Sequence, residues 1–143
     1  MPINFSTLDL FESPVELPIV VPIDQELSLC TGLAHQARLK YINVFELLDQ
    51  NLELTDVGYF SSPDNSRIVI CLVIKQKYWH ISNQSTILNS LLKLRDFCIL
   101  LDIYEIAFPK SFLTGPENIT WESLFSILDQ IFTFSPVFLH IYN

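Results

Sequence analysis

The sequence predicts an α/β domain in which a mixed, mostly parallel β-sheet is covered by helices on both faces. Short apolar runs rich in β-branched residues alternate along the chain with segments of helical periodicity. That order builds parallel sheets with helical crossovers. The 143 residues suffice for one core, and no linker, internal repeat or low-complexity tract divides them. We therefore expect a single domain over residues 1–143, with about six strands.

In the first half of the chain, strands and helices are expected in alternation. Ile3–Thr7 alternates as a short strand does. The run 17–22, LPIVVP, is bracketed by prolines and predicts a buried strand. Helical spacing follows at 33–41 and 44–50, and a further strand is expected at 54–60.

The second half is patterned more strongly. Strands are expected at 67–74, 106–109 and 136–142, and the first of these, RIVICLVI, is the most strand-like run and predicts a central strand. A long helix is expected at 82–102. The helix at 121–132 is specified best, because its apolar residues recur every three or four positions and share one face. Thr120 just before it is a suitable N-cap.

Composition and charge exclude several classes of function. No apolar run approaches the roughly 18–20 residues that a membrane span needs, and no basic region followed by an apolar stretch marks a signal peptide. The formal net charge is −8, with 16 acidic and 8 basic residues. Such a field repels phosphate backbones, so nucleic acid is not an expected partner. A small anion remains compatible, because backbone amides can bind a phosphate locally. Only 17% of the residues are charged and 50% are hydrophobic, which also allows a protein partner at an apolar surface.

The cysteines and histidines form no recognisable site. Cys30, Cys71 and Cys98 are odd in number and widely spaced, without disulfide-framework or zinc spacing. His35 and His140 have no partners at ligand or triad spacing. We therefore expect no metal, no cofactor, and a reducing, cytoplasmic setting.

The segment 105–132 has the order strand, turn-rich loop, amphipathic helix. In α/β folds this order can build a ligand pocket, since small molecules bind beyond the carboxyl ends of strands and against helix N-termini. Pro109 ends the strand and Gly115-Pro116 forces a turn. The alternative is that the loop only connects two elements.

Four stretches of the chain resemble the macrodomain family, a three-layer α/β/α fold that binds ADP-ribose. Asp9-Leu10-Phe11 resembles the motif after the family's first strand, and 21–34, VPIDQELSLCTGLA, resembles its first pocket loop. The stretch 72–91 resembles the strand and lysine-bearing loop of the small stand-alone branch that removes ADP-ribose from protein carboxylates. IAFPKSFLTGPENITWESL, together with 137–142, resembles the segment from the second phosphate loop to the final strand.

The resemblance implies roles for two groups of residues. Asp9 would accept a hydrogen bond from the adenine amino group, with the Leu10 N–H beside it. Gly32 would let the backbone approach the distal ribose and diphosphate, as a residue without Cβ can. Leu33 and Ala34 would follow at a helix start, where free N–H groups favour phosphate. The alternatives are that Asp9 only caps a turn and that Gly32 only serves a tight corner.

The second phosphate loop departs from the family pattern. The family's loop is rich in glycine, whereas the matching stretch here runs from Lys110 to Gly115, keeps one glycine and is one residue longer. We expect Ser111, Phe112, Thr114 and Gly115 to line the ligand, with Phe112 and its neighbour Leu113 bringing bulk where the diphosphate should approach.

The catalytic positions depart from the pattern as well. Lys75 matches the family's nucleophilic lysine, and Lys77 lies two residues further on. Pro116 stands where the branch has its catalytic aspartate, with Glu117 next to it. A lysine acts as a nucleophile only with a lowered pKa and a positioned acid nearby, which makes Lys75 and Glu117 the candidate catalytic pair. A solvated lysine at a strand end is the plain alternative.

Two functions follow from these residues. The first is an ADP-ribose-binding macrodomain that hydrolyses ADP-ribose from modified proteins or from an ADP-ribose phosphate ester. The alternative is a degenerate macrodomain that has lost its glycine-rich phosphate loop and acts as a protein-interaction module. The Met-Pro start close to the first expected strand is typical of a domain cut from a longer polypeptide, such as a viral polyprotein.

Overall fold

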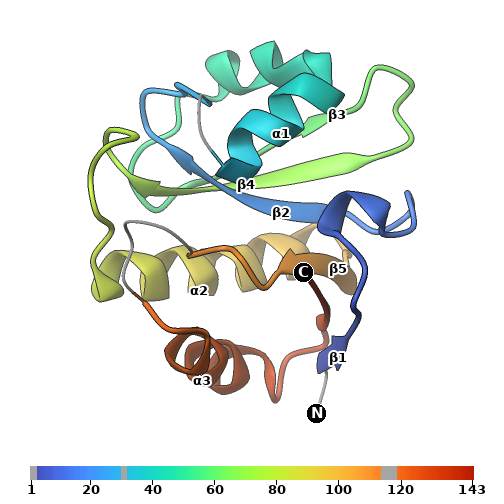
Figure 1. Cartoon of the computed structure of the whole chain (residues 1–143), viewed down its shortest axis with the longest axis vertical. Coiled ribbons are helices and arrows are strands. Elements are labelled where there is room, and N and C mark those ends of the chain that lie inside the picture. The colour runs from blue at the N-terminus through green and yellow to red at the C-terminus, as the bar shows by residue number, and fades with distance from the viewer. Residues whose placement is uncertain (1–2, 30–31, 114–118) are drawn as a thin grey trace.

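The computed structural model describes residues 3–29, 32–113 and 119–143. Within them, six strands form one sheet in the order β1-β6-β5-β2-β4-β3 (Figure 1). The strands are β1 (Ile3–Phe5), β2 (Ile19–Asp24), β3 (Val57–Ser61), β4 (Ile68–Lys75), β5 (Glu105–Pro109) and β6 (Phe138–Tyr142). All neighbours run parallel except β3, which pairs antiparallel with β4. The expected mixed, mostly parallel sheet is confirmed.

Helices cover both faces of the sheet, so the fold has three layers (Figure 1). They are α1 (Gly32–Lys40), α2 (Gln84–Leu100) and α3 (Trp121–Phe132), with the 3-10 helices η1 (Leu10–Glu12) and η2 (Ile42–Gln50). α2 and α3 pack with β5 and β6 in one buried cluster, whereas α1, η1 and η2 pack on the other face. In the described part of the chain, no helix is both long and apolar enough to cross a membrane.

The α2 and α3 helices form where the sequence predicts them. Thr120 caps α3, because its hydroxyl oxygen accepts a hydrogen bond from the Ser123 N–H at 3.2 Å. Asn83 caps α2 in the same way, accepting from the Thr86 N–H at 2.7 Å. The apolar residues of α3 that recur every three or four positions are buried: Leu124, Ile127, Leu128, Ile131 and Phe132. The predicted amphipathic helix and its cap are confirmed.

β2 does not end at Pro22, as its bracketing prolines suggested, but runs through it to Asp24. A proline lacks the N–H that a ladder needs, so inside sheets it is confined to edges and irregular positions. Here the register between β2 and β5 holds a single pair, Ile19 with Ala107. Beyond that pair, β2 pairs with β4 alone. On the β5 side of Pro22 there is therefore no strand pairing that needs a backbone N–H.

β4 lies inside the sheet but not at its centre. It has β2 on one side and the antiparallel edge strand β3 on the other. The strongly apolar run that predicted a central strand reflects burial on both faces, since six residues in a row, 69–74, are buried. Cover from both helical layers therefore explains the pattern, and a central position is not needed.

A buried arginine holds the amino-terminal end of β4 against the turn that precedes β2. Arg67 is 2% exposed. Its guanidinium donates to the carbonyl oxygens of Ser13 (2.7 Å), Pro14 (2.9 Å) and Leu17 (2.9 Å), and to the Ser13 hydroxyl oxygen (3.0 Å). Burying a cation in this way requires such acceptors. The 13–17 turn is thereby held at the amino-terminal edge of the sheet, opposite the edge where the predicted ligand residues lie.

Candidate functional site

The predicted site residues gather at one edge of the sheet. β1, β6, β5, β2 and β4 are parallel, so their carboxyl ends share that edge. Each predicted and described residue lies at or after one of these ends. Asp9 and Leu10 follow β1, Gly32 to Ala34 follow β2, Lys75 ends β4, and Ser111 and Phe112 follow β5.

The centre of this edge is a topological switch point. β2 and β5 are neighbours, yet the helix after β2 packs on one face and the helix after β5 on the other. The two strands are joined only at Ile19 and Ala107, where the Ala107 N–H donates to the Pro18 carbonyl oxygen at 2.8 Å. In open α/β sheets, ligands bind outside the carboxyl ends of strands at such a point. The topology therefore places the candidate site between the loops that follow β2 and β5.

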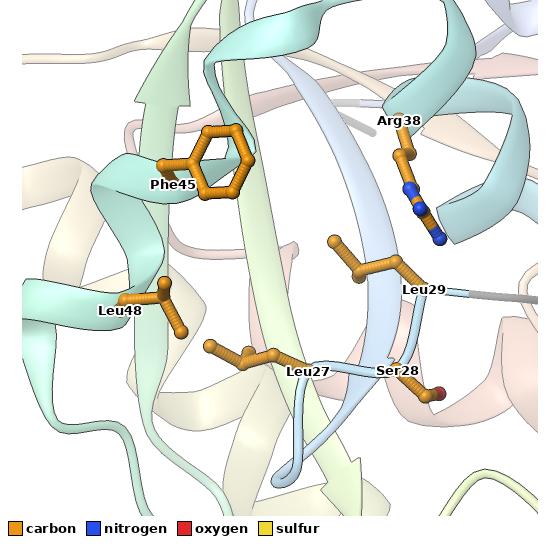
Figure 2. Close-up of a pocket in the computed structure, with 6 residues that line it drawn as sticks. All are labelled: Leu27, Ser28, Leu29, Arg38, Phe45 and Leu48. Atoms are coloured by element: carbon orange, nitrogen blue, oxygen red, sulfur yellow. The ribbon is translucent and has the colours of Figure 1, made fainter.

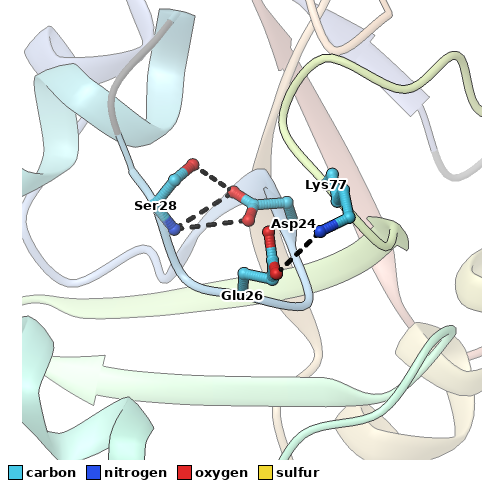
Figure 3. A network of polar contacts seen from close by, with 4 residues as sticks. All are labelled: Asp24, Glu26, Ser28 and Lys77. Carbon is cyan, nitrogen blue, oxygen red and sulfur yellow. Dashed lines mark hydrogen bonds and ion pairs between the residues drawn. The ribbon is translucent and has the colours of Figure 1, made fainter.

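The loop after β2 is held in shape by a buried carboxylate. Asp24 is 4% exposed. Its carboxylate accepts from the Ser28 N–H at 3.3 Å to each oxygen and from the Ser28 hydroxyl at 2.6 Å (Figure 3). The Leu27 N–H donates to the Asp24 carbonyl oxygen at 3.0 Å. A charged acceptor strengthens such bonds, so the start of the first pocket loop has one defined path.

The lysine-bearing loop after β4 is tied to this same loop. The Gln25 N–H donates to the Lys75 carbonyl oxygen at 2.8 Å, which continues the pairing of β2 with β4. The Lys77 ammonium lies 3.1 Å from a Glu26 carboxylate oxygen (Figure 3). Lys77 is thus engaged in a partly exposed ion pair. Lys75 is half-buried at the strand end.

Gly32 has an unusual backbone conformation at the start of α1. Its φ is +59°, a left-handed conformation that costs other residues energy. A Cβ built there would meet no atom within 4 Å, so the space beside it is open. Gly32 begins α1, whose first N–H groups have no partner within the helix. The buried Nδ1 of His35, one turn further on, has no hydrogen-bond partner among the described residues.

Asp9 has a structural role at the start of η1. Its carboxylate accepts from the Phe11 N–H at 3.1 Å, and its own N–H donates to Glu12 at 3.1 Å, which completes a capping box. The carboxylate is exposed and can still accept a further bond. The Leu10 N–H donates to the Asn143 carbonyl oxygen at 3.1 Å. Of this pair, the Asp9 carboxylate is the group that remains open to a further hydrogen bond.

The loop after β5 differs from its prediction. Phe112 is 3% and Leu113 is 4% exposed, and both belong to the buried cluster beneath α2 and α3. The Phe112 ring lies 4.9 Å from that of Phe108. Their bulk therefore points into the core and does not line a diphosphate, because burial of two large apolar side chains outweighs exposure at the loop. Ser111 is half-buried beside them. The predictions for Thr114, Gly115, Pro116 and Glu117 lie outside the described residues.

No protein-family model matches the sequence. The chain is 22% identical over 135 residues to ADP-ribose glycohydrolase OARD1 of Bos taurus, covering 94% of this chain and 87% of that protein. The macrodomain of Mycobacterium tuberculosis DarG superposes with a TM-score of 0.84 at 19% identity, over 98% of this chain and 96% of that one. The structure of Thermosipho africanus DarTG in complex with ADP-ribose gives 0.79 at 17% identity, over 97% of this chain and 41% of that one.

The fold is that of a macrodomain. Both superpositions cover nearly the whole chain, so the six strands and three α-helices are shared as one arrangement. The resemblance inferred from the four sequence stretches is confirmed at the level of the fold.

Sequence reasoning missed several residues at the carboxyl edge of the sheet. The Asp24–Ser28 bonds were not foreseen, although an aspartate at a strand end often accepts hydrogen bonds from the turn that follows it. Trp79, in the loop after β4, is 64% exposed and stacks edge-on against His80, with ring centres 4.4 Å apart. An exposed tryptophan beside the lysine-bearing loop offers a large contact surface at the rim of the site.

The described cysteines offer no nucleophile to this edge. Burial raises the pKa of the Cys71 thiol well above its usual range and that of Cys98 to about 12. Both thiols are free and buried. A thiol in such surroundings stays protonated and inert.

Proposed function

We propose that this macrodomain binds ADP-ribose at the switch point between β2 and β5. The observation that carries the proposal is the left-handed Gly32 beside open space at the start of α1, next to a loop fixed by Asp24. A diphosphate placed there would meet free helix N–H groups and a backbone without a side chain in the way. Similarity to proteins described as an ADP-ribose glycohydrolase and as a complex with ADP-ribose supports the same ligand.

Asp9 is proposed as the adenine acceptor. The Phe11 N–H fixes one of its carboxylate oxygens, which orients the group and leaves the other oxygen able to accept from an exocyclic amine. η1 lies on the same face of the sheet as α1, since Leu10, Ala34 and Ala37 share one buried cluster. Adenine and diphosphate would therefore occupy one continuous path along that edge.

We further propose that the protein removes ADP-ribose from modified proteins, with Lys75 as nucleophile and Glu117 as the positioned acid. Lys75 ends β4 in register with Asp24, at the same edge as the proposed diphosphate site. An ADP-ribosylated protein is then the substrate partner. The buried free thiols Cys71 and Cys98 suit a reducing, cytoplasmic setting.

Titration calorimetry with ADP-ribose tests the binding step, with AMP and ATP as controls. Selective micromolar binding of ADP-ribose is the expected result. If millimolar ADP-ribose gives neither heat nor a rise in Tm, the binding proposal fails, and the alternative of a protein-interaction module takes its place.

A second experiment tests the chemistry separately. Release of ADP-ribose from a mono-ADP-ribosylated protein is measured for the unaltered chain, Lys75→Ala and Glu117→Ala. The two variants should each lose release while retaining most of their affinity for free ADP-ribose. If the unaltered chain binds ADP-ribose but releases none, the hydrolase proposal fails for that linkage and the binding proposal stands.

A further inference from the structure

A cavity of about 270 Å³ lies between α1, η2 and the loop that follows β2 (Figure 2). Its lining residues are Leu27, Ser28, Leu29, Arg38, Phe45 and Leu48. Leu27, Ser28 and Leu29 belong to the loop that also borders the proposed ADP-ribose site, whereas Arg38, Phe45 and Leu48 lie on α1 and η2. The volume falls below the ~300–1,000 Å³ typical of sites for drug-sized ligands, so the cavity suits a short segment and not a dinucleotide-sized ligand.

The lining combines apolar side chains with one cation. Figure 2 shows Leu27, Leu29 and Leu48 directed toward a common space, with the Arg38 side chain approaching from α1. The side chains of Phe45 and Leu48 on η2 are 70% and 60% exposed. Large apolar side chains left open around a hollow mark a surface that another molecule covers.

The loop that forms the floor of the cavity is held in a strained path. Leu27 and Leu29 have φ values of +57° and +48°. Bulky residues rarely adopt this region, and strain of this kind persists only where the surroundings impose it. Here the bonds from Ser28 to the buried Asp24 impose it. The cavity is thus formed before any ligand arrives, which lowers the cost of ordering on binding.

Among the described residues that line the cavity, Arg38 is the one charged group. Among the described residues, no carboxylate lies within ion-pair distance of its guanidinium. This is notable in a chain of net charge −8. An arginine pairs best with a carboxylate, through two parallel hydrogen bonds. The cavity therefore requires an apolar group and a single carboxylate close together.

We propose that this cavity binds the carboxyl-terminal end of a partner polypeptide whose last residue is bulky and apolar. Such a residue carries its side chain and its terminal carboxylate on one Cα, which matches one cavity beside one arginine. Capture of a terminal carboxylate is a recurring mode of peptide recognition. The negative field of the whole protein disfavours a partner segment with several acidic residues, whereas one terminal carboxylate next to Arg38 satisfies the local charge.

Leucine-methyl NMR of the folded chain tests this proposal with defined probes. The probe is the acetylated tripeptide Gly-Gly-Phe with a free carboxyl terminus, compared with its C-terminal amide and with acetylated Gly-Gly-Gly. The acid should saturably shift the methyl signals of Leu27, Leu29 and Leu48. The amide should bind about tenfold more weakly, because it loses the charge-assisted pair with Arg38, and the glycine peptide should cause no shift.

Two exposed substitutions locate the effect, each with a matched control on α1. Arg38→Gln should weaken binding of the acid peptide about tenfold, to the affinity of the amide peptide. Lys40→Gln makes the same charge change outside the cavity and should leave the affinity for the acid peptide unaltered. Phe45→Ala should weaken binding of both peptides several-fold, whereas Leu39→Ala should leave both affinities unchanged. Since Phe45 and Leu39 are 70% and 68% exposed, neither change threatens folding.

Several outcomes overturn the proposal. One is the absence of methyl shifts at millimolar acid peptide; another is equal affinity for acid and amide. If 3-phenylpropionate binds as tightly as the peptide, the occupant is a small carboxylate and not a chain end. If the chain self-associates and Phe45→Ala abolishes the association, a second copy of this protein covers the cavity.

Discussion

The two faces of the sheet are built in different ways. On one face, α2 has 17 residues and α3 has 12, both carry side-chain N-caps, and both bury large apolar residues. On the other face, α1 has nine residues, of which only Ala34 and Ala37 are buried. η2 completes that layer while leaving Phe45 and Leu48 exposed.

This difference separates stability from binding. Long capped helices with large buried side chains stabilise the α2/α3 face through burial of apolar surface. Small residues let a short helix lie close to the sheet, with its N-terminus at the end of β2, and this layer carries both the proposed ADP-ribose site and the cavity beside Arg38. Binding regions are drawn from the less stable parts of a structure because they must stay open or move.

The largest expected effect is on the α2/α3 face. Phe132 is fully buried, and Phe132→Ala should lower the free energy of unfolding by about 3–5 kcal/mol, since it removes transfer energy and leaves a cavity. Urea denaturation followed by circular dichroism measures the change. Phe134 is 98% exposed, so Phe134→Ala is the matched control and should change stability by less than about 0.5 kcal/mol. Similar losses for both variants would contradict the proposed role of this face.

Arg67→Ala should give the next largest loss, about 3 kcal/mol, because four hydrogen bonds to the 13–17 turn lose their donor in a buried place. Equilibrium urea denaturation measures the loss. The partly exposed Arg95, which pairs with its neighbour Asp96, serves as control. Arg95→Ala should cost at most about 1 kcal/mol. A small loss in Arg67→Ala would mean that water replaces the arginine.

Asp9→Ala should weaken ADP-ribose binding by about 1–3 kcal/mol, the range for leaving a polar partner unpaired. It should also lower stability by about 1 kcal/mol through loss of the cap. Glu12→Ala separates the two effects, since it breaks the other half of the capping box and leaves the Asp9 carboxylate in place. Titration calorimetry with ADP-ribose on both variants distinguishes the two roles. Equal losses of affinity in Asp9→Ala and Glu12→Ala would mean that Asp9 acts only as a cap.

Gly32→Ala should lower the free energy of unfolding by about 1–2 kcal/mol, because the strain of a left-handed residue is the whole cost where space is open. Its loss of ADP-ribose affinity should exceed what a general destabilisation of the fold would cause, since the new Cβ would occupy space proposed for the ligand. Leu33→Ala, one position on, is the control for a general disturbance of α1. Unchanged affinity in Gly32→Ala would remove this glycine from the site.

Periodicity predicted most elements of the fold. The bounds of α3 and the Thr120 cap were predicted correctly, because a helix that packs on one face has apolar residues every three or four positions. The limits of β2 were not predicted correctly. Whether the strand could continue through Pro22 depended on whether β5 pairs with it at that position. The side-chain directions of Phe112 and Leu113 could not be read either, because a loop has no period that assigns a face. An origin in a viral polyprotein stays a prediction.

The sequence by itself determined the strands, the helices, the macrodomain resemblance and the residue types at the carboxyl edge, because each depends on neighbours within a few positions. Only the tertiary structure decided what those residues can reach. It paired the Leu10 N–H with the Asn143 carbonyl oxygen and assembled the cavity beside Arg38. Each of these depends on how segments meet in space, through hydrogen bonds and packing that no local pattern encodes.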